Sequence, residues 1–156
     1  MSGPGVWLRL QFFASRHITP RLPVRQLYQL TGGRIGSSMP SVRPHILLLT
    51  VVGRRSGTPR TSPLMYFEID GKLVVAGTNG AQDRVPQWCQ NLRAQPQATV
   101  QIGASRSSVA ARFTEGAERA QLWSEMKAIH PLFVLYENTA SRTIPVVVLD
   151  RSPSAT

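Results

Sequence analysis

The sequence predicts an α+β fold built around a mainly antiparallel β-sheet of about six strands that closes, wholly or partly, into a barrel. Three observations predict it: short apolar runs of strand length, hairpin turn signals between them, and two or three segments with helical periodicity. Strands joined by hairpins pair antiparallel, and closing the sheet leaves no unpaired edge. We expect one domain, with the barrel over residues 45–150, a basic helical and loop extension over residues 1–44, and a tail over residues 151–156.

The first half of the barrel follows from apolar runs and turn residues. Residues 46–52 are apolar and β-branched, which predicts a buried strand. Residues 53–59 have the composition of a turn, and residues 60–69 resume as a strand. The Asp70-Gly71 pair is a hairpin signal that leads into a third strand over residues 72–76.

The second half mixes helices with strands. Residues 77–81 read as a loop, and the next segment is a short helix that ends before Pro96. Its apolar face consists of Val85, Trp88, Cys89 and Leu92. We expect the later elements to be a strand pair at 98–102 and 108–114, helices at 118–129 and 132–138, and a final strand at 144–149. The inserted segment 85–96 would then cover one end of the barrel.

The N-terminal extension has apolar residues at helical spacing, including Val6, Leu10 and Phe13. Two interpretations stay open: a helix that packs on the domain, or an amphipathic segment that lies on an anionic membrane. No stretch reaches the roughly 20 apolar residues that span a bilayer, and no charged region precedes the apolar start. With a single cysteine, Cys89, we expect a cytoplasmic protein, with peripheral contact at the inner face of the plasma membrane as the alternative.

The net charge is +10, and 16 of the 18 basic residues are arginines. Residues 1–67 hold nine arginines and no acidic residue, so the excess of positive charge lies in the N-terminal part of the sequence. This distribution predicts a one-sided positive electrostatic field, which attracts nucleic acid, an anionic membrane or an acidic small molecule. The sequence has no basic and aromatic interleaving and no recognisable DNA-binding motif, so nucleic acid is not the expected partner.

The turn at residues 53–60 combines two glycines with Arg54, Arg55, Ser56 and Arg60. Glycine permits left-handed backbone, and clustered backbone N–H groups, a hydroxyl and guanidinium groups can hold an anion. An ordinary basic hairpin turn is the alternative. The turn lacks the spacing of a phosphate-binding Walker loop and of a dinucleotide fingerprint.

Two further groups are candidates for a site. The glycine-containing loop 77–80 comes shortly before a helix start, where backbone donors and the helix dipole favour anions. His130 could donate a proton near neutral pH, and Tyr136 could line a substrate pocket; a structural role is open for both. Trp88 could pack on a ring or belong to the core. No cluster has metal-ligand spacing, so no metal is expected.

Several stretches in the same order resemble the deazaflavin-dependent nitroreductase family. They are LTVVGRRSG (49–57), PRTSPL (59–64), PQW (86–88), NL (91–92), AQP (94–96) and RTIPVVVL (142–149). The resemblance covers about residues 43–150 and implies a split β-barrel that uses coenzyme F420, an 8-hydroxy-5-deazaflavin, in its reduced form. It implies hydride transfer to a small-molecule electron acceptor, namely a quinone, an activated alkene or a nitro compound.

The resemblance also implies site residues. Those that would hold the phosphate and glutamate tail are Arg54, Arg55, Ser56, Arg60, Thr61 and Ser62. The loop beside the ring would be Ala76, Gly77, Thr78 and Asn79, with Phe133 near the ring. The helix that completes the cofactor site would contribute Gln87, Trp88, Cys89, Gln90 and Asn91. The proton would come from Tyr136, His130 or solvent.

Two rival hypotheses remain at this point. One is a reductase on the same barrel that binds FMN, because phosphate recognition alone does not separate the two cofactors. The other is a non-enzymatic protein that binds an anionic membrane or nucleic acid, which the charge alone supports. The sequence does not predict the oligomeric state.

Overall fold

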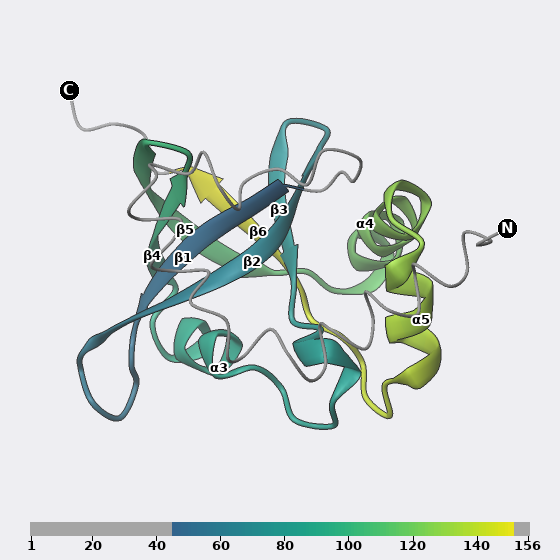
Figure 1. Ribbon diagram of the computed structural model, residues 1–156, viewed down its shortest axis with the longest axis horizontal. Coiled ribbons are helices and arrows are strands. Elements are labelled where there is room, and N and C mark those ends of the chain that lie inside the picture. The colour runs from purple at the N-terminus through teal and green to yellow at the C-terminus, as the bar shows by residue number, and fades with distance from the viewer. Residues whose placement is uncertain (1–44, 152–156) are drawn as a thin grey trace, which may run out of the picture.

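A computed structural model describes residues 45–151 of the chain. Six antiparallel strands close into a barrel in the order β1-β2-β3-β6-β5-β4, as Figure 1 shows. The strands are β1 (His45–Val52), β2 (Pro59–Ile69), β3 (Lys72–Ala76), β4 (Gln97–Ile102), β5 (Ser105–Phe113) and β6 (Val146–Arg151). The predicted α+β barrel is confirmed, and closure pairs β1 with β4 and β3 with β6.

Helices occupy the two long connections. They are the one-turn 3-10 helix η2 (Asn79–Ala81) and the α-helices α3 (Gln87–Ala94), α4 (Gly116–Ile129) and α5 (Leu132–Thr139). In Figure 1, α3 lies at one end of the barrel, whereas α4 and α5 lie together at its side. The expectation that residues 85–96 cover one end of the barrel agrees with the packing of α3 against β1.

The central strands are buried on both faces. Along β3, Val75 belongs to the cluster inside the barrel, whereas Val74 packs outward under α4 and α5. β6 follows the same alternation, with Val147 inside and Val148 outside, and all four side chains are 0% exposed. Because successive strand side chains point to opposite faces, two cores require a continuous apolar run. This explains why these strands lack polar alternation.

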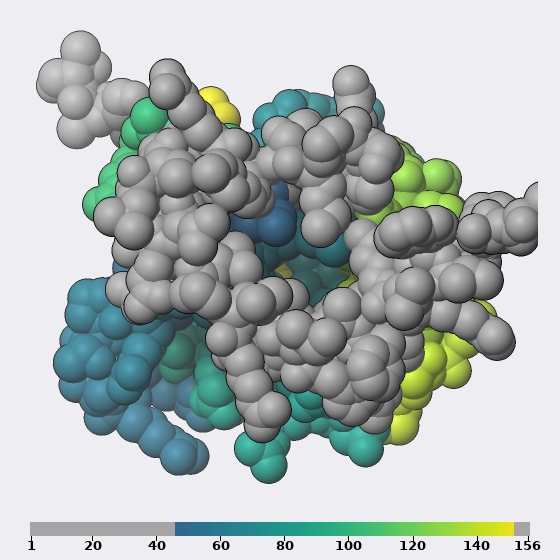
Figure 2. Space-filling model, in the orientation of Figure 1, coloured from purple at the N-terminus to yellow at the C-terminus, as the bar shows by residue number. Residues whose placement is uncertain are grey.

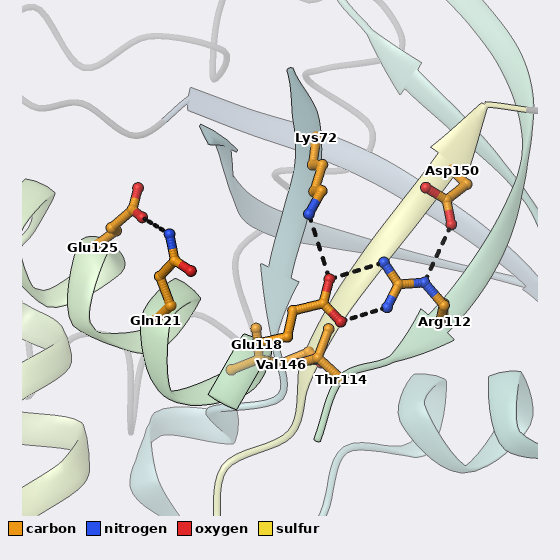
Figure 3. A network of polar contacts seen from close by, with 8 residues as sticks. All are labelled: Lys72, Arg112, Thr114, Glu118, Gln121, Glu125, Val146 and Asp150. Atoms are coloured by element: carbon orange, nitrogen blue, oxygen red, sulfur yellow. Dashed lines mark hydrogen bonds and ion pairs between the residues drawn. The ribbon is translucent and has the colours of Figure 1, made fainter. Parts of the chain in front are cut away.

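A polar network fastens the start of α4 to the barrel (Figure 3). Arg112 on β5 holds the Glu118 carboxylate with two hydrogen bonds, of 2.7 and 3.0 Å. Lys72 on β3 lies 3.4 Å from the same carboxylate, and Arg112 lies 3.6 Å from Asp150 on β6. The hydrogen bonds from Arg112, followed by its charge and by Lys72, lower the pKa of Glu118.

Some predicted boundaries differ from the structure. β5 begins at Ser105 and not at residue 108, because the pairing with β4 continues to a tight turn. β6 begins at Val146, two residues later than predicted, because Pro145 lacks the N–H that a ladder needs. The predicted loop 77–81 contains η2. The interpretations of residues 1–44 lie outside the described residues, and no helix within 45–151 is long and apolar enough to cross a membrane.

Candidate active site

Arg54 joins the turn after β1 to α3. Its Nη1 donates to Gln87 Oε1 at 2.8 Å and to Asn91 Oδ1 at 2.9 Å, and its Nη2 donates to Gln90 Oε1 at 2.7 Å. Its backbone N–H also donates to Asn91 Oδ1, at 3.2 Å. The structure therefore brings together two predicted groups of site residues that are more than thirty positions apart in the sequence.

The turn itself is closed by its own backbone. Gly53 N donates to Thr58 O, and Gly57 N donates to Gly53 O, both at 2.8 Å. Gly57 has a φ of 67°, which favours glycine. The Ser56 hydroxyl lies 2.8 Å from the Thr58 hydroxyl, so one of its hydrogen bonds is made inside the turn. Figure 2 shows the end of this β1–β2 hairpin at the surface of the molecule.

The other two arginines of the turn are available to a ligand. Arg55 and Arg60 are exposed, and neither guanidinium group makes a hydrogen bond or ion pair within the part of the chain that the structure describes. Arg60 lies opposite Val51, a residue of the barrel interior, so its side chain leaves β2 on the inner side of the sheet at the barrel end. The predicted anion-binding turn therefore keeps two guanidinium groups at the surface.

Thr61 and Ser62 lie on opposite faces of β2. Thr61 is opposite Thr50, and their hydroxyls are 2.9 Å apart beside a cavity of about 110 Å³ on the outer face. Ser62 is opposite Leu49, whose side chain is inside the barrel. Because side chains alternate along a strand, one ligand on one face of the sheet does not contact both.

The loop after β3 is fixed by Arg142, to which no sequence pattern alone assigns a role. Its Nη2 donates to Gly77 O and Thr78 O, both at 3.0 Å, and its Nε donates to Gln82 O at 2.9 Å. Burial lowers the pKa of Arg142. On its other side Arg142 lines a cavity of about 360 Å³ between α4, α5 and the segment before β6, which contains none of the predicted site residues.

The same loop has a tight backbone. Asn79, Gly80 and Ala81 all have left-handed φ values, of 46°, 60° and 59°. Asn79 donates its side-chain N–H to Arg84 O at 2.9 Å, which holds the turn. A Cβ on Gly77 would lie 2.7 Å from Cys89 Sγ, so this position has no room for a side chain. The predicted residues 76–79 thus form a fixed edge above α3.

Trp88 and Cys89 point into the barrel core. Trp88 is 6% exposed and Cys89 is 0% exposed, and both pack in the inner cluster. Burial raises the pKa of the Cys89 thiol to about 12. The polar residues and the backbone of α3 are therefore the parts of this helix that a ligand can reach, and the structural interpretation of Trp88 agrees with this packing.

Phe133 and Tyr136 lie in the cluster outside the barrel, and His130 packs edge-on against Phe133 with ring centroids 6.2 Å apart; each of the three is at most 3% exposed. The Phe133 ring packs edge-on against Phe67 at 5.1 Å and against Tyr136 at 5.4 Å. His130 Nδ1 accepts a hydrogen bond from Leu132 N at 3.2 Å at the start of α5. Burial lowers the pKa of His130, so the ring is neutral at pH 7. These three residues lie apart from Arg54 and α3, on the side of the barrel that α4 and α5 cover.

A family model described as F420H(2)-dependent quinone reductase matches residues 21–151. The chain belongs to this family. It is an oxidoreductase with coenzyme F420 as its cofactor, which confirms the predicted deazaflavin family, enzyme class and cofactor. An F420H(2)-dependent quinone reductase of Mycobacterium tuberculosis is 33% identical over 128 residues, which cover 80% of this chain and 85% of the relative. A second M. tuberculosis protein, a putative F420H(2)-dependent quinone reductase, is 33% identical over 103 residues, which cover 66% of this chain and 87% of that protein.

Solved structures agree with the fold. An F420H2-dependent reductase, FDR-A, superimposes with a TM-score of 0.62 at 32% identity and covers 72% of this chain and 99% of its own. A structure described as a domain-swapped dimer has a TM-score of 0.63 at 31% identity and covers 95% of this chain and 100% of its own. The Vibrio cholerae heme storage protein HutZ, with a TM-score of 0.54 at 12% identity, shares the fold alone. The split β-barrel prediction is thereby confirmed.

The donors at the α3 end of the barrel fit an acidic cofactor. Arg55 and Arg60 present guanidinium groups, and Gln87 is exposed on the first turn of α3. The backbone N–H groups of that turn have no partner inside the helix and carry the positive end of its dipole. Among residues 45–151, no group of histidine, cysteine and acidic side chains could hold a metal ion. The two guanidinium groups, the Gln87 amide and these backbone N–H groups are all donors that suit an anion.

Proposed function

We propose that the protein transfers a hydride from reduced coenzyme F420 to a quinone, and that it holds the acidic tail of the coenzyme between the turn 53–60 and the start of α3. The observation that carries the proposal is the set of hydrogen bonds from Arg54 to α3, which join the basic turn to the helix. The bound deazaflavin supplies the hydride, and the protein supplies position and electrostatics.

Arg55 and Arg60 are the direct ligands of the tail in this proposal. Both are exposed and unpaired within residues 45–151, so they bind an anion without first breaking an internal ion pair. A hydrogen bond to a charged group contributes about 1.5–3 kcal/mol. Arg54 is less available to the tail, because three of the five N–H donors of its guanidinium are already used by Gln87, Gln90 and Asn91.

Residues 76–79 line the ring of the coenzyme in this proposal. Arg142 donates hydrogen bonds to the carbonyl oxygens of Gly77 and Thr78, so the loop is ordered before a ligand binds. Ordering a site in advance removes part of the entropic cost of positioning the reactants. The buried Trp88 and Cys89 support this edge from the core.

Reduction of a quinone to a hydroquinone requires one hydride and one proton. His130 and Tyr136 are each 3% exposed, and the lowered pKa of His130 disfavours the imidazolium form that would act as an acid at neutral pH. We therefore assign this proton to solvent. Activated alkenes and nitro compounds are alternative acceptors for the same hydride.

The first experiment is a fluorescence titration of the purified protein with oxidised coenzyme F420, with FMN in parallel. We expect saturable binding of the deazaflavin and weak binding of FMN. The variants Arg55→Met and Arg60→Met should each raise Kd about tenfold, which corresponds to about 1.4 kcal/mol. Arg151→Met removes an exposed charge from the end of β6 and should leave Kd within about twofold as the control.

Turnover is measured next by the loss of F420H(2) absorbance with menadione, an enone and a nitroarene as acceptors. The quinone should give the highest kcat/KM. Binding of FMN without the deazaflavin would refute the cofactor site, and an unchanged Kd in the double variant of Arg55 and Arg60 would refute the tail assignment. Peripheral membrane contact is a separate proposal, which sedimentation with anionic vesicles tests by comparing the full chain with a chain that begins at residue 45.

A further inference from the structure

The partners of Arg54 are all side-chain amides of one helix. Nη1 gives one hydrogen bond to Gln87 and one to Asn91, which uses both of its N–H groups, and Nη2 gives one to Gln90. A guanidinium has donors only, so each amide must turn its carbonyl oxygen toward Arg54. Arg54 thus sets the orientation of three amide groups at once.

Turning the oxygen inward turns the amide nitrogen outward. For Gln90, the nitrogen donates to Val85 O at 3.1 Å, so this amide is used within the protein. For Gln87, the N–H₂ group has no acceptor among residues 45–151, and the side chain is exposed on the first turn of α3. The Gln87 nitrogen therefore adds a fixed neutral donor to the free backbone N–H groups of that turn.

We propose that Arg54 is a positioning residue, which does not bind the coenzyme tail itself but holds Gln87 so that its amide N–H₂ binds the tail. This inference rests on the proposed function, because it assigns a role at the same site. Arg55 and Arg60 supply charge directly, whereas Arg54 acts through the helix. Without Arg54, the Gln87 amide is free to rotate and to present its oxygen to the anion.

A double-mutant cycle separates the two roles of an arginine at this place. Arg54→Lys keeps the charge, but a point charge on a flexible stem does not reproduce the planar fork that reaches three carbonyl oxygens. Gln87→Met keeps the length of the side chain and removes the amide. Kd for oxidised coenzyme F420 is measured for both single variants and for the double variant. The parallel cycle pairs Arg55→Met with Gln87→Met.

We expect Gln87→Met and Arg54→Lys each to raise Kd about five- to tenfold, in line with the loss of one hydrogen bond. In the Gln87→Met background, Arg54→Lys should add less than about twofold, because its effect passes through the missing amide. Arg55→Met should raise Kd by the same factor whether or not Gln87 is replaced. Equal effects of Arg54→Lys in both backgrounds, or no effect in either, would overturn the inference.

A second measurement needs no substitution and covers the case in which Arg54→Lys unfolds the turn. Side-chain N–H signals of the unmodified protein are followed by NMR during titration with the coenzyme. The Gln87 amide and Arg55 Nε–H signals should shift strongly, and the Arg54 Nε–H signal should shift much less. Equal shifts at Arg54 and Arg55 would overturn the inference. An unmodified protein that binds no coenzyme would instead contradict the proposed function.

Discussion

Gly77 is the position at which a single methyl group should do the most damage. Its φ is not left-handed, so alanine meets no backbone penalty there. A Cβ would, however, lie 2.7 Å from Cys89 Sγ and 3.2 Å from Pro145 Cδ. The sulfur cannot yield easily, because Cys89 is 0% exposed in the barrel core, and the ring of Pro145 is rigid.

Overpacking of this kind costs about 1–3 kcal/mol. With a urea m-value of about 2 kcal/mol/M, a loss of about 2 kcal/mol lowers the midpoint of Gly77→Ala by roughly 1 M. Urea denaturation followed by fluorescence measures this directly. Gly77→Ala should also raise Kd for coenzyme F420, since the loop 76–79 must shift away from α3.

Removal of the Cys89 sulfur tests whether its clash with the new methyl group causes the loss of stability in Gly77→Ala. Cys89→Ala alone should cost about 1 kcal/mol, as a small buried truncation does. In that background Gly77→Ala should cost at least about 1 kcal/mol less than in the unmodified protein. Gly71→Ala is the control: its φ is 73° with no atom within 4 Å, so it loses about 1 kcal/mol to left-handed strain whether or not Cys89 is present. Additive losses for Gly77→Ala and Cys89→Ala would refute the clash.

Three further outcomes follow from single residues. The pKa of His130 is lowered from 6.5, so the unfolded chain binds a proton before the folded protein does; stability should fall as the pH drops below about 6.5, and His130→Gln should flatten this slope in urea titrations at several pH values. The pKa of Glu118 is lowered from 4.5, so its contribution to stability is present above that pH and is lost as the pH falls further. Glu118→Gln should lower the urea midpoint at pH 7, and 1 M NaCl should reduce the difference between the midpoints of the variant and the unmodified protein. Ala81 is strained by its left-handed φ of 59°, and glycine would relieve this strain, so Ala81→Gly should change the free energy of unfolding by less than about 1 kcal/mol. Ala98→Gly in β4 relieves no such strain and should lower the free energy of unfolding by more than that in the same thermal melts. Equal losses for the two variants would contradict the strain at Ala81.

The barrel could be predicted because its local signals agree with its packing. The Asp70-Gly71 turn has φ values of 49° and 73°, the left-handed pair that this dipeptide favours between two strands. The apolar runs of β3 and β6 fill two cores, and their β-branched residues also favour strand conformation locally, so burial and local preference agree. Agreement between turn chemistry and burial is what makes a strand readable from sequence.

The site could be predicted only in part, because its contacts depend on distant residues. The charge of Arg54 is evident from the sequence, but its three amide partners lie 33 to 37 positions away and carry no charge signal. Arg142 reaches the loop of Gly77 across 65 positions. The left-handed φ of Ala81 has no sequence signal, since alanine rarely adopts it.

β6 has a particular consequence for how the chain reaches its fold. Among the strands of residues 45–151 it is the last in chain order, and it lies between β3 and β5 and pairs with both. A nascent chain that has released β1 to β5 therefore carries two strands with open hydrogen-bonding edges, which can pair with a neighbouring molecule. The ring closes only when residues 146–151 emerge. Pairing of this short segment with β3 and β5 is therefore the step that removes the open edges from newly made protein.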